Sequence, residues 1–327
     1  MDKVAAEPNK RITFLPRDFF YPSVLMIAVC LGLATGFTIH GSLKPPISTT
    51  EGNASNYAPD KEAILAHYEK VKGSTKNYLG ELAPHEFVSI AYSLLERHPY
   101  VYSRGFGTSL ALGGISQDIQ STTIKEGGRY FEESNSIGLV KLYDRMYQEG
   151  ETTTKYWGST PSYEKNAPVT MGNDEYKESM GRYVSESLIY VVSEKTEGKE
   201  DLSGDGLTQV KTSGDGYLVD FEGVPSLITL NYVRQMKTIS SLKEYPSFDF
   251  VHLQWKLDAN LELQWFKTHE KYQASTMGVT SPCEGRMTTV YVYGDSGTVP
   301  IPKPGEAWAE KYPKNSDELL TQYGFSE

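Results

Sequence analysis

A long apolar run near the N-terminus constrains this chain more than any other feature of its sequence. Residues 19–39 contain no charged side chain. A helix needs about 20 mostly apolar residues to cross roughly 30 Å of hydrocarbon, and no other stretch of the chain meets that requirement. We therefore expect residues 19–39 to form one membrane-spanning helix, with the bulk of the chain on one side of the membrane.

The charges before this run predict its orientation. Lysine and arginine are in excess on the cytoplasmic side of membrane helices, whereas aspartate and glutamate count for little. The leader, residues 1–18, carries four basic side chains: Lys3, Lys10, Arg11 and Arg17. We expect a single-pass protein of the cell membrane, held by a signal-anchor, with its N-terminus in the cytoplasm and its bulk domain outside.

Two further interpretations concern the same segment. A cleaved signal peptide has a shorter apolar core and a small-x-small cleavage site, for which residues 34–36 qualify. Small residues also recur at every fourth position, at Ala28, Gly32 and Gly36. Such a face lets helices approach closely in lipid and would suit an accessory subunit of a larger membrane complex, but ordinary glycine and alanine usage in membrane helices is the favoured interpretation.

Charge and cysteine content narrow the partners and the chemistry. The chain has a formal net charge of −10 at pH 7. Sequence-independent binding of nucleic acid depends on lysine and arginine that neutralise phosphates, so we expect no nucleic-acid partner. Cys283 is the only cysteine after the membrane segment and can form no disulfide within the domain. We interpret it as a packed small hydrophobe, with a free reactive thiol as the alternative.

Beyond the membrane segment the chain divides into three parts. Residues 40–59 contain prolines and polar residues without apolar periodicity, which is typical of a linker. Residues 60–299 hold helical and alternating patterns and should form one extracytoplasmic domain. Residues 300–327 are proline-rich and polar, and we expect a C-terminal tail there with a short helix over residues 316–323.

Helical signals open the domain. Asp60 can cap a helix that begins at Lys61, and Pro84 stands at a favoured first position of a second helix, whose apolar residues fall on one stripe. The pair His98-Pro99 should end that second helix. Two later helices are predicted over residues 173–183 and 226–242.

Most of the remaining domain reads as short strands separated by turn residues, a pattern typical of an antiparallel meander. The runs cover residues 100–109, 115–124, 128–134, 139–148, 152–157, 187–192, 217–221, 248–257, 261–272 and 287–293. The run over 139–148 fits a helix as well as a strand.

The predicted fold class is therefore α+β, with a curved antiparallel sheet, up to a half-barrel, packed on a few helices. Its general layout is similar to that of bacterial envelope carrier proteins with a half-open antiparallel barrel. This resemblance is one of architecture and not of motif.

Four aromatic residues are candidates for lining a ligand cavity: Trp157, Trp255, Trp265 and Tyr272. Trp255 and Trp265 occupy alternating apolar positions on the two arms of the hairpin over residues 248–272, so we expect both to point to the same covered side of the sheet. Ordinary core packing and an apolar cavity are the two interpretations.

Motifs with recognisable chemistry are weak. Asp201, Ser203 and Asp205 match the first three ligand positions of a calcium loop, but the twelfth position is Thr212 and not glutamate, so a turn is the favoured interpretation and calcium the weaker one. Residues 240–243 have Ser-x-x-Lys spacing without the companion motifs. Gly105-Phe106-Gly107 lacks the third glycine of a dinucleotide fingerprint. We expect no cofactor and no metal, and we lean against an enzyme.

These observations leave three hypotheses for the function. The first is a membrane-anchored, extracytoplasmic, non-enzymatic protein of the cell envelope that binds a partner or an envelope component. The second is a carrier or sensor of an apolar ligand inside the curved sheet. The third is a single-span accessory subunit of a larger membrane complex.

The anchor generates the first prediction. Because an uncleaved helix over residues 19–39 would hold the protein in the bilayer, the full-length chain should sediment with the membrane fraction and keep its original N-terminus. Fractionation followed by N-terminal sequencing measures both. A mature chain that starts near Phe37 would show instead that the segment is a cleaved signal peptide.

Overall fold

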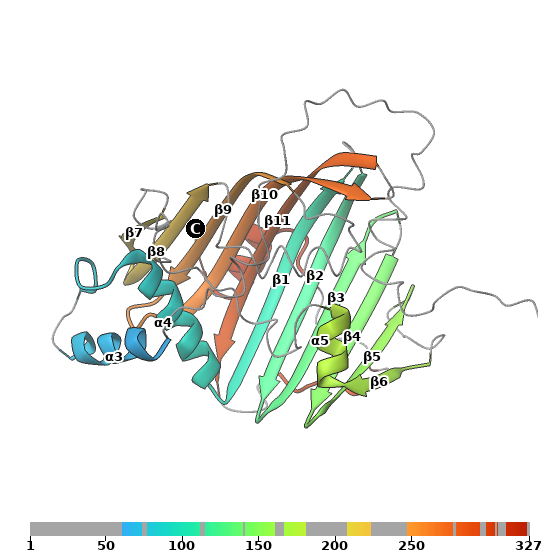
Figure 1. The fold of residues 1–327 in the computed structure, drawn as a ribbon, viewed down its shortest axis with the longest axis horizontal. Helices are drawn as coiled ribbons and strands as arrows, with labels where there is room; N and C mark the ends of the chain where they lie inside the picture. Colours follow the sequence, from blue (N-terminus) through green and yellow to red (C-terminus); the bar gives the residue numbers. More distant parts are fainter. Residues whose placement is uncertain are drawn as a thin grey trace, which may run out of the picture.

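In the computed structural model, the described part of the chain folds around one antiparallel sheet of eleven strands. The structure describes residues 61–73, 77–111, 115–139, 141–160, 167–180, 208–223, 247–276, 279–294, 299–304, 306 and 312–325. Across the sheet the strands follow the order β6-β5-β4-β3-β2-β1-β11-β10-β9-β8-β7 (Figure 1). Their bounds are β1 Tyr100–Ala111, β2 Ile115–Glu126, β3 Arg129–Ile137, β4 Lys141–Glu149, β5 Thr152–Gly158, β6 Val169–Gly172, β7 Thr208–Ser213, β8 Gly216–Gly223, β9 Ser247–Leu257, β10 Leu263–Thr276 and β11 Val279–Tyr293.

Neighbouring strands of the sheet are consecutive in the chain, apart from β1 and β11, whose pairing brings the two halves of the sequence together. Gly127 and Gly128 turn the chain between β2 and β3 with φ angles of 55° and 84°. Residues that carry a side chain rarely adopt positive φ angles, whereas glycine does so readily and therefore suits this turn. The result is an open sheet with β6 and β7 at its edges.

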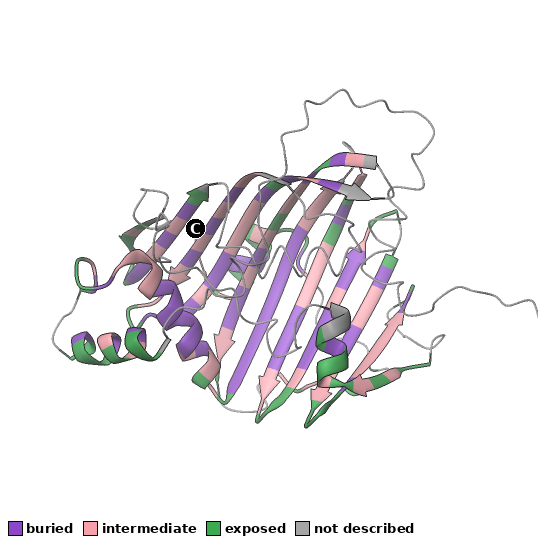
Figure 2. Cartoon of the chain, viewed as in Figure 1, coloured by how far each residue is buried: buried purple, intermediate pink, exposed green. Residues whose placement is uncertain are grey.

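Four helices complete the described part of the fold: α3 Lys61–Lys72, α4 Pro84–Arg97, α5 Asn173–Met180 and α7 Ser316–Gln322. Helix α4 begins with proline at its first turn, and the Glu86 carboxylate accepts a hydrogen bond of 2.7 Å from the Ala83 backbone N–H. It ends at His98 because the following proline disfavours helical geometry there. Its apolar stripe is buried along its length (Figure 2).

The cross-strand register separates the side chains into two faces. Helices α3, α4 and α5 pack on one face, which we call the helix-side face, and it carries Val101, Trp255, Phe266 and Met146. The described residues between Val299 and Phe325, which include α7 and which we call the C-terminal segment, pack on the other face, the C-terminal face. In Figure 1, α3 and α4 lie over one end of the sheet and α5 over the other.

The apolar core of the helix-side face is filled by α4. Trp255 is completely buried, stacks on Phe266 at 5.1 Å between ring centroids, and donates a hydrogen bond of 3.1 Å to the Tyr92 hydroxyl. Phe87 packs against Tyr217 at 5.2 Å between ring centroids. Trp255 therefore belongs to the packed core, one of its two interpretations.

The C-terminal face is covered by chain that the sequence predicts to be a polar tail. Leu319 and Leu320 of α7 are buried against Phe106, Trp265 and Val290. A helix over residues 316–323 is expected from the sequence, but its burial is not, because the surrounding residues are polar and proline-rich. The described part of residues 300–327 thus packs as part of the domain and not as a tail.

The expected fold class agrees with the structure at the level of an antiparallel sheet with few helices. The helices that begin at Lys61 and Pro84 are confirmed, and the ambiguous run over residues 139–148 contains strand β4. The predicted helix over 226–242, the predicted strand over 187–192 and the predicted membrane helix over 19–39 lie outside the described residues. Within those residues, the structure contains no helix of the length and apolarity that a membrane crossing requires.

The expectation that Trp255 and Trp265 share one side of the sheet is wrong. In the hairpin of β9 and β10, Leu263 pairs with Leu257, but Trp265 pairs with Lys256, so β10 advances two residues while β9 advances one. This irregularity reverses the side to which the following residues point. Trp265 consequently lies on the C-terminal face against α7, while Trp255 lies under α4.

The second prediction follows from the core position of Trp255. Trp255→Ala should lower the free energy of unfolding by about 3–5 kcal/mol, because a large buried side chain is replaced by a cavity. Leu139→Ala is the control: Leu139 is 72% exposed, and its truncation should change stability by less than about 0.5 kcal/mol. Urea unfolding followed by circular dichroism measures both, and a Trp255 loss no larger than the control would contradict the core assignment.

Candidate binding surface on the helix-side face

Helix α4 covers only one end of the strands on the helix-side face. At the C-terminus of α4, His98 Nε2 lies 3.0 Å from Glu262 Oε1, and Glu262 immediately precedes β10. The Tyr92 hydroxyl of α4 accepts a hydrogen bond from Trp255 near the end of β9. Tyr272 lies further along β10, about 30 Å beyond Leu263 at roughly 3.4 Å per residue. The helix-side face therefore continues along the strands well beyond the start of β10, and its residues there fall into three zones.

The central zone, which we call the floor, lies on β1, β2 and β11 around Gly105 and Gly107, with the ends of the Met287 and Ser121 side chains beside them. A Cβ atom at Gly105 would lie 2.4 Å from both Met287 Cε and Ser121 Oγ, and one at Gly107 would lie 2.2 Å from the Arg286 carbonyl oxygen. Gly107 has no room for a side chain because the close atom belongs to the backbone, whereas at Gly105 the close atoms are the ends of the Met287 and Ser121 side chains. The two glycines of the run Gly105-Phe106-Gly107, which has no phosphate-loop context in the sequence, are explained by this close packing.

The second zone is apolar and lies at the far end of β10 and β11. Tyr272, Ala274 and Cys283 are 5%, 2% and 6% exposed and continue the apolar cluster that α4 covers. Burial raises the pKa of the Tyr272 phenol well above its ordinary value, and the neighbouring Cys283 and Glu270 add to the shift. Cys283 is buried and forms no disulfide within the described residues, as its interpretation as a packed hydrophobe requires.

The third zone is polar and aromatic and lies on β3, β4 and β5. Asp144 on β4 is directly opposite Ser134 on β3 and Trp157 on β5. Glu132 and Lys155 stand two residues away on the flanking strands, on the same face. Beside this zone, Tyr176 of α5 packs on Met146.

Asp144 has an unusual environment for a carboxylate. Its Oδ1 atom is buried and has no hydrogen-bond donor, although the residue as a whole is partly exposed. Burial raises the pKa of the Asp144 carboxyl; the positive charge of Lys155 partly offsets this shift, and the negative charge of Glu132 increases it. No sequence motif marks Asp144, and only its cross-strand neighbours reveal the site.

The four aromatic candidates from the sequence do not form one cavity. Trp255 is in the core under α4, and Trp265 lies on the opposite face. Tyr272 and Trp157 remain on the helix-side face beyond α4, at the apolar and the polar zone respectively. The structure therefore places Trp255 and Tyr272 in the buried apolar cluster of the helix-side face, Trp157 in the polar zone of that face and Trp265 on the opposite face.

Other predicted sites lie outside the described residues. These are the small-residue face of Ala28, Gly32 and Gly36 and the weak calcium candidates Asp201, Ser203 and Asp205. In the described ranges, no group of three metal-ligating side chains converges.

Four histidines of the described chain each contact one carboxylate, a pattern that local sequence spacing does not reveal. The pairs are His67–Glu86 at 2.8 Å, His98–Glu262 at 3.0 Å, His252–Asp220 at 2.6 Å and His269–Glu284 at 2.8 Å. Arg286, followed by His269, holds the pKa of Glu284 below its ordinary value. The pairs join separate parts of the fold and act as surface ties between strands or helices.

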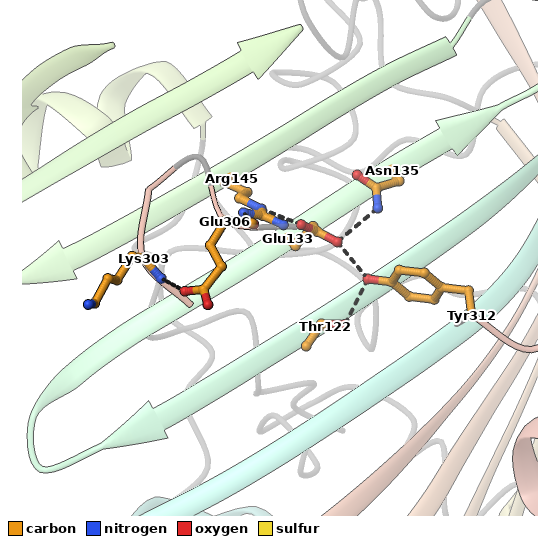
Figure 3. A network of polar contacts seen from close by, with 7 residues as sticks. All are labelled: Thr122, Glu133, Asn135, Arg145, Lys303, Glu306 and Tyr312. Carbon is orange, nitrogen blue, oxygen red and sulfur yellow. Dashed lines mark hydrogen bonds and ion pairs between the residues drawn. The ribbon is translucent and has the colours of Figure 1, made fainter. Parts of the chain in front are cut away.

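A buried polar network ties the C-terminal segment to the other face of the same strands (Figure 3). Glu133 on β3 is paired with Arg145 on β4, and both side chains are almost fully buried. The Glu133 carboxylate also accepts hydrogen bonds of 3.0 Å from the Tyr312 hydroxyl and from the Asn135 amide. Thr122 lies 2.7 Å from the Tyr312 hydroxyl, and Arg145 donates to the Glu306 carbonyl.

This network serves structure, because every charge in it is matched. The Arg145 guanidinium contacts the carboxylate and a backbone carbonyl, and the carboxylate has three donors. Burial and the nearby Glu133 raise the pKa of the Tyr312 phenol well above its ordinary value, so Tyr312 remains a hydrogen-bond donor. The network holds the C-terminal segment on its face.

Comparisons with known proteins add a distant structural likeness. No protein-family model matches the chain, and no curated protein matches it either. Among solved structures, the chain is similar to the crystal structure of a LolA superfamily protein from Nitrosomonas europaea, with 6% sequence identity and a TM-score of 0.23. The match covers 64% of this chain and 92% of that chain. A likeness this weak carries no argument about the function of this chain.

The third prediction concerns the buried ion pair. Arg145→Met should lower the free energy of unfolding by about 3–5 kcal/mol, because it leaves the Glu133 carboxylate buried without its countercharge. The matched control is Arg286→Met, which removes an exposed partner of Glu284 and should change stability by about 0–1 kcal/mol. The double variant Glu133→Gln with Arg145→Met should recover part of the loss in urea unfolding, whereas additive losses would show that the two residues act independently.

Proposed function

We propose that this protein is a membrane-anchored, extracytoplasmic binding protein that holds an amphipathic ligand on the helix-side face of its sheet. The observation that carries this proposal is the pairing of an apolar zone and a polar zone on one face. Tyr272, Ala274 and Cys283 supply the apolar zone, and Asp144 with Trp157 supplies the polar one. A ligand with an apolar and a polar part would match both.

The way α4 covers only part of the apolar residues on this face supports the proposal. The apolar side chains near the start of β10 pack in one cluster with α4. Trp255 and Phe266, which stack on each other, belong to this cluster. The apolar side chains at the far end of β10 and β11 lie along the strands beyond the start of β10 and continue the same buried cluster. Between the zones, Gly105 and Gly107 add no side chain of their own, and the flexible Met287 side chain occupies the space beside them.

Among the hypotheses from the sequence, this arrangement favours a carrier or sensor over a protein that binds a partner. A partner-binding surface would place its aromatic residues on an exposed patch. Here Tyr272 is 5% exposed, and the one large apolar side chain with high exposure in the described chain is Leu139.

The membrane anchor is proposed on the sequence of residues 19–39 and on the basic residues that precede them. An anchored, outward-facing domain would meet amphipathic molecules that leave or enter the bilayer. Anchor and binding surface are separate proposals, and each has its own experiment.

The fourth prediction tests ligand binding. Native mass spectrometry of the gently solubilised full chain should detect a co-purified small amphipathic molecule as a mass adduct. Ser121→Tyr, on the helix-side face opposite Gly105, should abolish the adduct because the new ring would cover the floor. Ser116→Tyr places the same residue on the same strand but on the C-terminal face, and it should leave the adduct intact.

Circular dichroism of both variants controls for folding. A wild-type protein without an adduct, or a folded Ser121→Tyr variant that keeps it, would contradict a ligand surface on this face.

A further inference from the structure

Two carboxylates on neighbouring strands have opposite surroundings in this fold. Glu133 on β3 points to the C-terminal face and has Arg145, Tyr312 and Asn135 as partners. Asp144 on β4 points to the helix-side face, and its buried Oδ1 atom has no donor. The chain therefore satisfies the carboxylate that holds its structure together and leaves this second one unsatisfied.

An unsatisfied buried oxygen lowers the stability of a fold and requires an explanation, such as a bound molecule that supplies the missing donor. The neighbours of Asp144 restrict what that molecule could be. Burial is the main cause of the raised pKa of the Asp144 carboxyl, with Lys155 opposing the shift and Glu132 adding the smallest part of it. A positively charged donor would therefore replace the solvation that the buried carboxylate lacks. A donor that carries positive charge is favoured over a neutral one, and an anion is disfavoured.

The aromatic ring beside Asp144 points to the same chemistry. Trp157 is its direct cross-strand partner on β5, and Ser134 is its partner on β3. The face of an indole ring attracts cations, and tryptophan does so best among the aromatic side chains. A carboxylate and an indole on adjacent strands, with side chains on one face, would contact an ammonium group from two directions.

We propose that Asp144 and Trp157 form a subsite for a protonated amine, the polar head of the ligand that the helix-side face holds. This inference rests on the proposed function and specifies its ligand class. The Asp144 Oδ1 atom accepts a hydrogen bond from the ammonium group, and Trp157 packs against it.

The test uses three small probes with the same ring and different heads: benzylammonium, benzyl alcohol and benzoate. Equilibrium dialysis of the full chain in a non-ionic detergent, with protein-free micelles as the blank, measures their binding. The wild-type protein should bind benzylammonium at least about tenfold more tightly than either of the other probes, since its ammonium group is both charged and a donor.

Asp144→Asn should remove this preference, because it keeps the size of the side chain and removes its charge. Glu149→Gln is the matched control, since Glu149 is an exposed carboxylate on the same strand, and it should leave the preference unchanged. Trp157→Leu should weaken binding of benzylammonium more than binding of benzyl alcohol. Circular dichroism confirms the fold of each variant.

The proposal is overturned if the wild-type protein prefers benzyl alcohol or benzoate, or if folded Asp144→Asn keeps the full preference for benzylammonium. Either result leaves the proposed function standing as long as the co-purified adduct is present and is lost in Ser121→Tyr. If the wild-type protein carries no adduct but still prefers benzylammonium, the amphipathic ligand is contradicted and an isolated amine site at Asp144 remains.

Discussion

A single open sheet exposes two faces, and the fold of this protein depends on shielding both of them with chain from outside the sheet. Side chains along a strand alternate between the two faces, so a sheet with apolar residues on both faces needs chain packed on each face to shield them from water. We call these two packed parts of the chain covers. Helix α4 covers one end of the helix-side face, and the segment that contains α7 covers part of the other. Trp255 and Trp265 illustrate the rule, because each is buried by a different cover.

The two covers are attached by different physics. Helix α4 is held by apolar burial, with Phe87, Ile90 and Leu95 completely inaccessible to solvent. The C-terminal segment combines the apolar contacts of Leu319 and Leu320 with the ion pair of Glu133 and Arg145 and its link to Tyr312. A buried ion pair adds little net stability compared with apolar packing, but it tolerates only one arrangement of its partners. The polar network therefore specifies where the segment lies more than how strongly it is held.

Much of this architecture could be predicted from local pattern. The helix from Pro84 has a start signal, an apolar stripe and a proline stop, and most of the strands carry alternation with glycine turns. The register irregularity between Leu263 and Trp265 could not be predicted, because it changes pairing without changing composition. The burial of α7 could not be predicted for a related reason. Leu319 and Leu320 are two apolar residues in a polar segment, and only their contacts with the C-terminal face of the sheet show why they are buried.

The candidate site was less accessible to sequence reasoning than the fold. Trp157 and Tyr272 could be singled out by residue type, but Asp144 is one acidic residue among 42 and is distinguished only by its neighbours on β3 and β5. Those neighbours are residues 10 or more positions away along the chain, brought together by hairpins. Local spacing cannot report such a constellation, whereas cross-strand register can.

Register also links the structural ion pair to the proposed subsite. Glu133 and Arg145 are directly opposite each other on β3 and β4, and the next pair along the strands is Ser134 and Asp144. A slip of one residue in either strand would move its whole set of side chains to the other face. It would place a charged group of the ion pair on the helix-side face or Asp144 under the C-terminal segment, and the buried pair forbids both because each partner would lose its countercharge. The same contact that anchors the C-terminal segment thus keeps Asp144 on the helix-side face.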